Sequence, residues 1–278
     1  MHASQAEYRE LYDLVHARDR QPLYWRVLAP WVEAHAAERD WLRSFASRTG
    51  NPVPPAELED LWRLYALSRV NETLLLSFQR GRADGTNWPG PKVSLDEYVR
   101  FVESLGLTVA QTQSFSPFYH EIVEVDQTEK DDEPVTLVSA SWPCLMLGDM
   151  MFSRAGVRVS GGKKFIQKEV AEASTLYWAY RRKNRPYQDL SRDWGSNSQW
   201  RTSFRRDYLL GRVVHYNVDG RRDLSRLEPM AKDRDGLTQL ERIELLTNRC
   251  FITVTKAHSD SWPYDDQYSV AAEGGTGR

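Results

Sequence analysis

The sequence contains little cysteine and no long apolar run. Only Cys144 and Cys250 occur among its 278 residues, and they lack Cys-x-x-Cys spacing. Both are therefore expected to be reduced and buried as small hydrophobic residues. The longest apolar stretch, near residues 142–152, is interrupted by a proline, a glycine and an aspartate. It falls short of the roughly 18 apolar residues that a membrane span needs, so no membrane partner is predicted.

Other familiar signals are also missing. The first ten residues lack the charged and then apolar pattern of a secretory signal, which predicts a cytoplasmic protein. No internal repeat or extended low-complexity tract is present, and no motif predicts a cofactor. The composition, 41% hydrophobic and 27% charged, is typical of a globular protein. Tryptophan is common, at 10 residues, which suits either a core or an interface.

Residues 1–112 have the periodicity of amphipathic helices. Apolar residues recur at helical spacing over about 5–18, and a second helical region is expected to kink or restart at Pro30, which lacks an amide hydrogen. Pro55 fits the first turn of a third helix that is expected to reach about Phe78. We therefore predict an acidic, helical amino-terminal region that forms a bundle.

Two helix starts carry a specific local signal. Ser94 and Glu97 have the spacing of a capping box, in which each side chain bonds a free amide at the helix start. Gly106 then suits the left-handed residue that ends a helix. Thr238 and Glu241 repeat the capping-box spacing ahead of another apolar run.

Residues 113–278 are dominated by a period of two, which predicts strands. The alternating runs lie at 120–126, 135–139, 157–159 and 214–218, and a β-rich run covers 250–255. Asp219-Gly220 is expected to form a hairpin turn. Helical spacing returns over about 163–182, whereas 199–209 fits either a helix or a strand. The predicted fold is α+β: a helical bundle followed by a mixed, mainly antiparallel sheet with two or three helices. Whether regions 1–112 and 113–278 share one core is left open.

The segment from Arg154 to Arg226 has the strongest charge asymmetry in the chain. It holds 17 Lys and Arg against 7 Asp and Glu, a net charge of +10, whereas the whole chain has a net charge of −2. Aromatic residues alternate with these cations, and arginine beside flat rings suits both phosphate contact and base stacking. Asymmetry of this kind indicates an anionic partner.

Two interpretations of the segment 154–226 remain open. In one, it faces solvent and recognises RNA, DNA or a phosphorylated small molecule. In the other, the acidic flanks fold over it and neutralise its charge, with the aromatic residues in the core. The first interpretation predicts phosphate-contacting cations at Lys163, Lys164, Arg181, Arg182, Lys183, Arg185, Arg201, Arg205 and Arg206, and stacking rings at Trp194 and Trp200.

The local sequence Ser160-Gly161-Gly162-Lys163-Lys164 also has two interpretations. At a helix start, glycine amides and lysines would bind a phosphate group. The spacing differs from that of a P-loop, because Val157 replaces the first glycine and Lys164 replaces the magnesium-binding Ser or Thr. The alternative is a Gly-Gly turn between two strands, which the sequence favours.

Two histidine-containing groups are candidates for catalysis. If each predicted strand is regular, His120, Glu124 and Asp126 share one face, and so do His215, Asn217 and Asp219. Such groups suit acid–base chemistry or a hard metal ion. Each is also explained by the polar face of a half-buried strand.

Three functions are therefore consistent with the sequence. The charge asymmetry favours a polyanion-binding protein, because it extends over the whole chain. An alternative is an interaction factor or immunity-type inhibitor, whose acidic region or aromatic loops bind a basic protein. The third is a metal-dependent hydrolase that uses His120, Glu124, His215 and Asp219. The sequence alone does not decide whether a reaction is catalysed.

Overall fold

The computed structural model describes residues 3–17, 22–81, 88–179, 181–185, 200, 202–226, 236–254 and 263–272. Within these ranges the chain forms helices and mostly antiparallel strands, so the predicted α+β class is confirmed. That the amino-terminal helices form a bundle stays a prediction. None of the helices in the described ranges has the length and apolar character needed to cross a membrane.

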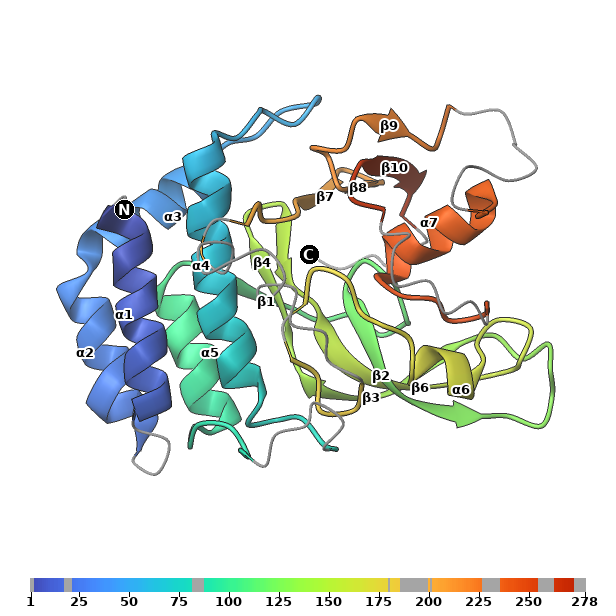
Figure 1. Cartoon of the computed structure of the whole chain (residues 1–278), viewed down its shortest axis with the longest axis horizontal. Coiled ribbons are helices and arrows are strands. Elements are labelled where there is room, and N and C mark those ends of the chain that lie inside the picture. The colour runs from blue at the N-terminus through green and yellow to red at the C-terminus, as the bar shows by residue number, and fades with distance from the viewer. Residues whose placement is uncertain are drawn as a thin grey trace.

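The helices come mainly from the first region of the chain. They are α1 (Ala3–Ala17), a π-helical turn (Tyr24–Leu28), α2 (Ala29–Ala34), α3 (Ala36–Ala46), α4 (Leu58–Leu75), α5 (Leu95–Ser104), α6 (Lys168–Ala171) and α7 (Gln239–Asn248). Figure 1 shows α1, α4 and α5 on one side of the molecule, with the strands beside α4. Pro30 lies in the first turn of α2, directly after the π-helical turn. The backbone stays helical through Leu28 and Ala29, so the irregularity expected at this proline takes the form of a π-helical turn within a continuous helix.

Both predicted capping boxes are confirmed. The Ser94 side chain accepts the amide of Glu97, whose carboxylate accepts the amide of Ser94. Thr238 and Glu241 make the same reciprocal pair at the start of α7. Gly106 follows α5 with φ 91°, a left-handed conformation that glycine adopts without steric cost.

The strands form two sheets. The seven-stranded sheet has the order β1-β4-β5-β7-β8-β10-β9, and the three-stranded sheet has the order β2-β6-β3. The strands are β1 (Thr108–Ala110), β2 (His120–Gln127), β3 (Thr136–Trp142), β4 (Cys144–Leu147), β5 (Met150–Ser153), β6 (Ala155–Gly161), β7 (Asp207–Leu210), β8 (Val213–Tyr216), β9 (Arg222–Asp223) and β10 (Asp266–Ala271).

One bent hairpin joins the two sheets. Strands β3 and β6 pair in the small sheet, and their continuations β4 and β5 pair in the large one. The chain changes sheet at Pro143 on one arm and at Arg154 on the other. Trp142 packs at this corner against Gly156, where an added Cβ would lie 2.2 Å from the indole, and its Nε1 donates to the Arg154 carbonyl at 2.9 Å. The corner therefore holds Arg154 in the interior.

Two hydrophobic clusters lie on either side of the hairpin. The first contains Tyr8, Leu64 and Tyr98 from the helices together with Leu145 and Met150 from the large sheet. The second lies between the sheets and contains both cysteines. Cys144 and Cys250 are buried free thiols, as expected from the sequence, and burial raises the pKa of Cys144 to about 12.

Three local predictions are wrong. The predicted helix over 163–182 is reduced to α6 in the described part, and Trp178 and Arg181 beyond it adopt positive φ, which a continuous α-helix excludes. Asp219-Gly220 does not close the predicted hairpin between β8 and the strand that follows it, since β8 pairs with β7 and β10. The described residues of the run 250–255 form no strand, and two of their amides donate to the Glu244 carboxylate instead.

Candidate functional site

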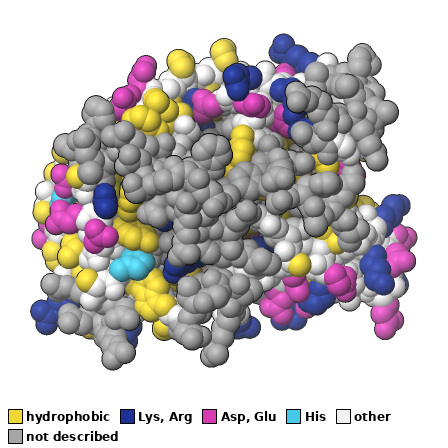
Figure 2. Space-filling view, in the orientation of Figure 1, with side chains coloured by type: hydrophobic (Ala, Val, Ile, Leu, Met, Phe, Trp, Pro, Cys, Tyr) yellow, Lys and Arg dark blue, Asp and Glu magenta, His cyan; other side chains and the backbone are white. Residues whose placement is uncertain are grey.

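Most of the predicted phosphate-contacting residues are buried. This contradicts the expectation that they face solvent. Figure 2 shows the described Lys and Arg side chains scattered among acidic ones on the face in view, without one continuous basic patch. The buried cations are Arg182, Lys183, Arg185, Arg205 and Arg206.

Arg182 is neutralised by two acidic side chains. It donates to Glu72 of α4 and to Glu121 of β2, with Nε 2.6 Å from Glu121 Oε1. Burial lowers the pKa of Arg182, but the two carboxylates outweigh burial and raise it above its ordinary value. Arg182 therefore joins the amino-terminal helices to the small sheet, as the second interpretation of the basic segment requires.

Other cations of the segment bond the backbone or an aspartate. Lys183 Nζ donates to the carbonyls of Leu76 and Pro89, each at 2.7 Å. Arg206 makes a forked pair with Asp219, with N–O distances of 2.8 and 2.6 Å. These groups have internal partners, so they are not available as surface contacts for nucleic acid.

The remaining predicted ligands differ in position. Lys163 and Lys164 are exposed in a turn that precedes α6, and Arg181 is half-buried. The favoured Gly-Gly turn is correct to that extent, but the residues after it form no strand. The Trp200 ring lies 5.3 Å from the Tyr12 ring of α1 in an edge-to-face contact. Trp194 and Arg201 lie outside the described residues.

The proposed catalytic group does not assemble. A β-bulge in β2 between Ile122 and Glu124 reverses the alternation, so buried His120 lies on a different face from Glu124. Glu124 pairs instead with Arg158. His215 belongs to β8 in the other sheet, where its Nδ1 lies 2.9 Å from Ser269 Oγ. Among the described residues, no three His, Cys, Asp or Glu side chains are arranged to hold a metal ion.

A different cluster lies where the two sheets meet. Asp207 Oδ1 accepts Arg205 Nε at 2.7 Å and the amide of Asn217 at 2.8 Å. Asp207 Oδ2 lies 3.6 Å from Arg154 Nη2 and 3.5 Å from Arg249 Nη2. We call Asp207, Arg154, Arg205 and Arg249 the Asp207 cluster. One carboxylate thus serves three guanidinium groups.

Three separate elements position this cluster. Arg154 lies at the corner between β5 and β6, and Arg205 and Asp207 lie at the start of β7. Arg249 follows α7 with φ 61°, a left-handed conformation that costs a non-glycine residue on the order of 1 kcal/mol. Glycine would adopt this conformation without that cost.

Several polar atoms of the Asp207 cluster have no hydrogen-bond partner in the described part of the chain. All three guanidinium nitrogens of Arg154 are among them, although its side chain is only 2% exposed. Asp207 Oδ2, Arg205 Nη1 and Arg249 Nε share this property. Buried charges are normally paired and hydrogen-bonded, since an unmet group loses its hydration without replacement.

The pKa values of the cluster reflect burial first and neighbouring positive charge second. Burial lowers the pKa of Arg205 and of Arg249 to about 10, and the neighbouring guanidinium groups add to this effect. Burial also lowers the pKa of Arg154. For Asp207, burial raises the pKa, but the three arginines outweigh it and hold the pKa below its ordinary value. At neutral pH all four groups are therefore charged.

The chain matches none of the family models, curated proteins or solved structures with which it was compared. Function is therefore inferred from the chemistry of these side chains.

His120 lies near Arg154 and is neutral at pH 7. Its Nδ1 accepts the backbone amide of Ser116 at 3.0 Å, which places the ring proton on Nε2, 3.3 Å from Thr112 Oγ1. Burial, with a smaller contribution from the charge of Arg154, lowers the pKa of His120 to about 4. Protonating Nδ1 would break the Ser116 bond, so the ring is held in one tautomer.

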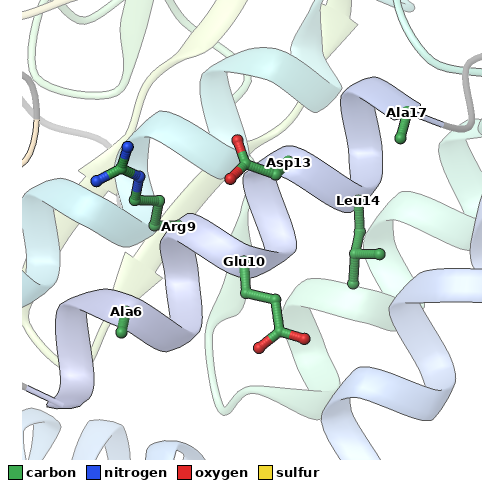
Figure 3. A pocket seen from close by; sticks show the side chains of 6 residues that line it. All are labelled: Ala6, Arg9, Glu10, Asp13, Leu14 and Ala17. Carbon is green, nitrogen blue, oxygen red and sulfur yellow. The ribbon is translucent and has the colours of Figure 1, made fainter.

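A hollow on the outer side of α1 offers less chemistry. Figure 3 shows that its six lining side chains all come from this one helix, with Arg9 and Asp13 pointing to one side and Glu10 and Leu14 to the other. Among the described residues no second element contributes a side chain to this lining, so the hollow does not bring polar groups from different elements together around a ligand.

Sequence reasoning missed Arg154 and Arg249 as site residues. Arg154 was only the boundary of the basic segment, and Arg249 lay outside it. Two signals were present. Arg154 interrupts a strand-like apolar run between Met150 and Val159, and Arg249 follows the capped helix where glycine is common.

Proposed function

We propose that this protein binds a phosphate-bearing ligand, or a ligand with a similar oxyanion, at the Asp207 cluster. The observation that carries the proposal is the buried Arg154 side chain, whose three nitrogens lack hydrogen bonds in the described part of the chain. A guanidinium group presents a planar fork of donors that matches phosphate and carboxylate oxygens.

The energetics support a binding role over a purely structural one. An unpaired buried charge destabilises a fold, and replacing it with an apolar side chain of similar size is often neutral or stabilising. Arg154 lies 3.6 Å from Asp207 Oδ2, but Arg205 and Arg249 also pair with this carboxylate, so Asp207 keeps two guanidinium partners without Arg154. A buried charge whose hydrogen bonds are not met inside the protein is typical of functional sites.

The proposal retains the phosphate-bearing ligand expected from the sequence and changes where it binds. Of the predicted contacts with described positions, Lys163 and Lys164 remain as exposed cations. They lie beside the acidic loop 129–133, where the Lys164 amide donates to the Asp131 carbonyl at 2.9 Å. An extended RNA or DNA backbone requires a longer row of accessible cations. The buried cluster suits a small ligand or a terminal group.

The test is the melting temperature in potassium phosphate compared with potassium chloride at equal ionic strength. For the unsubstituted protein we expect a rise that follows the logarithm of phosphate concentration, because a ligand that binds only the folded state stabilises it by mass action. Phosphate also stabilises proteins generally, by exclusion from their surface. The informative quantity is therefore the difference between variants.

Arg154→Met should remove the site-specific part of this rise. In chloride its free energy of unfolding should be unchanged or higher by up to about 2 kcal/mol, because the cost of burying a guanidinium group without hydrogen bonds is removed while Arg205 and Arg249 remain beside Asp207. Arg226→Met is the matched control, since Arg226 belongs to the same basic segment and its side chain is 86% exposed. Equal phosphate responses in all three proteins, with Arg154→Met less stable in chloride, would make Arg154 a structural residue and overturn the proposal.

A further inference from the structure

The Asp207 cluster has a defined charge excess. Three arginines surround one aspartate, so its net charge at neutral pH is +2. Extending the set to the neighbouring Arg182, Arg185, Glu72 and Glu121 gives five arginines and three carboxylates, which is again +2. Among the described residues, the excess is the same for these two choices of boundary.

Because the cluster is buried, its excess positive charge should distinguish ligands by their own charge. The side chains of Arg154, Arg205 and Asp207 are at most 2% exposed, so water and salt screen their charges weakly. In such surroundings a ligand of charge −2 cancels the excess, whereas one of charge −1 leaves an uncompensated cation. The contrast with Arg182, whose pKa two carboxylates raise, shows what compensation does at a neighbouring guanidinium.

Arg249 is the most exposed residue of the Asp207 cluster. The Arg249 side chain is 11% exposed, whereas Arg154 and Arg205 are more deeply buried. Arg205 also donates to the Leu246 carbonyl at 2.7 Å, which leaves Arg154 and Arg249 as the main donors on the Oδ2 side of Asp207. A group entering from the Arg249 side needs a free end, because an internal phosphodiester continues in two directions.

From this charge and this access we infer that the Asp207 cluster selects a terminal dianionic oxyanion, as in a phosphate monoester, over the monoanionic phosphodiesters of a nucleic-acid backbone. The inference rests on the proposed function, since it names which anion that site takes. A phosphate monoester has its second pKa near about 6, so it is a dianion at pH 7.5.

Calorimetric titration with pairs of small anions that differ by one charge tests the selection. The pairs are methyl phosphate with dimethyl phosphate, and sulfate with methyl sulfate, at pH 7.5. We expect each dianion to bind at least about tenfold more tightly than its monoanionic partner. Inorganic phosphate is titrated in parallel. Binding of inorganic phosphate without methyl phosphate indicates a site for free phosphate, and binding of both indicates a site that also accepts an ester. Lowering the pH to 5.5 should weaken methyl phosphate and leave sulfate unchanged, because only the phosphate gains a proton.

Arg249→Gly is the variant for this experiment. It removes one guanidinium and keeps the backbone, because φ 61° suits glycine, so the folded protein should be retained. Its excess charge falls to +1, and the preference for the dianion should shrink to less than about threefold. Arg226→Gly in the same titration should keep the full preference, since Arg226 is exposed and lies outside the cluster.

The outcomes separate the two claims. If monoanions and dianions bind equally and Arg154→Met abolishes both, the proposed function stands and the charge selection is wrong. If no anion binds to the unsubstituted protein, both are wrong. A preference for dianions that Arg249→Gly leaves unchanged would place the selection outside the Asp207 cluster and overturn the inference.

Discussion

A buried arginine keeps its charge at neutral pH even when burial lowers its pKa. The values of about 10 for Arg205 and Arg249 leave both fully protonated at pH 7. Their charge must be met by another group, and Asp207 supplies one carboxylate for three guanidinium groups. The proposal of an anion at this cluster thus rests on individual residues and not on the net charge of the chain.

At the same scale, His120 predicts an acid-dependent loss of stability. Its pKa is about 4 in the folded protein, against 6.5 in an unfolded chain, so below pH 6.5 the unfolded state binds a proton that the folded state does not. The contribution of neutral His120 to the free energy of unfolding should be fully present above pH 6.5. It should fall by about 2 to 3 kcal/mol as the pH drops toward 4. Urea unfolding over this pH range measures it.

His120→Gln should reduce that acid-dependent loss. Glutamine offers a carbonyl oxygen to the Ser116 amide and does not titrate. The control is His215→Gln, because His215 is a half-buried histidine on the other sheet and its removal should leave most of the loss in place. An identical pH profile for His120→Gln and the unsubstituted protein would contradict the assignment.

At the scale of elements, reciprocal caps define the starts of α5 and α7. Ser94 is exposed, so its contribution comes from the cap and not from burial. Ser94→Ala should lower the free energy of unfolding by about 1 kcal/mol, because the Glu97 amide loses its partner. Chemical denaturation measures the change.

Ser104→Ala is the matched control for the cap. Ser104 lies at the other end of α5, where its hydroxyl donates to the Phe101 carbonyl. That substitution should change stability by less than about 0.5 kcal/mol. Equal losses for Ser94→Ala and Ser104→Ala would mean that the cap contributes nothing specific.

The bent hairpin is the element that creates the candidate site. Because β3–β4 and β5–β6 cross from one sheet to the other, Arg154 is carried inward at the change of sheet. The contact between Gly156 and Trp142 holds the corner, since the ring occupies the space that a side chain at Gly156 would need. A short strand break thus determines the position of the least satisfied arginine.

At the scale of the whole molecule, one hydrophobic cluster includes both the amino-terminal helices and the large sheet. We therefore expect one unfolding transition, with helical circular dichroism and tryptophan fluorescence changing together. Leu145→Ala, in β4 of this cluster, should lower the free energy of unfolding by about 2 to 5 kcal/mol, and both signals should report the same decrease.

Val138→Ala provides the comparison for that substitution. Val138 lies in β3 and is 48% exposed, so its truncation should have little effect on either signal. Separate transitions, with Leu145→Ala moving the fluorescence signal alone, would show that the helices and the sheet unfold independently.

The sequence by itself determined the features that depend on near neighbours. The capping boxes at Ser94 and Thr238, the irregularity at Pro30, the strand containing His120 and the α+β class all follow from residues a few positions apart. The signal failed over 163–182 because apolar spacing alone does not exclude residues with positive φ, such as Trp178 and Arg181.

Only the tertiary structure decided which charges meet. Arg182 pairs with Glu72 on α4, and Asp207 pairs with Arg154 and Arg249, which come from elements distant in the sequence. A one-residue bulge also separates His120 from Glu124. These outcomes depend on strand order and on long-range packing, which place side chains in a low-dielectric interior where the nearest opposite charge matters most. A net charge of +10 along one segment does not contain that information.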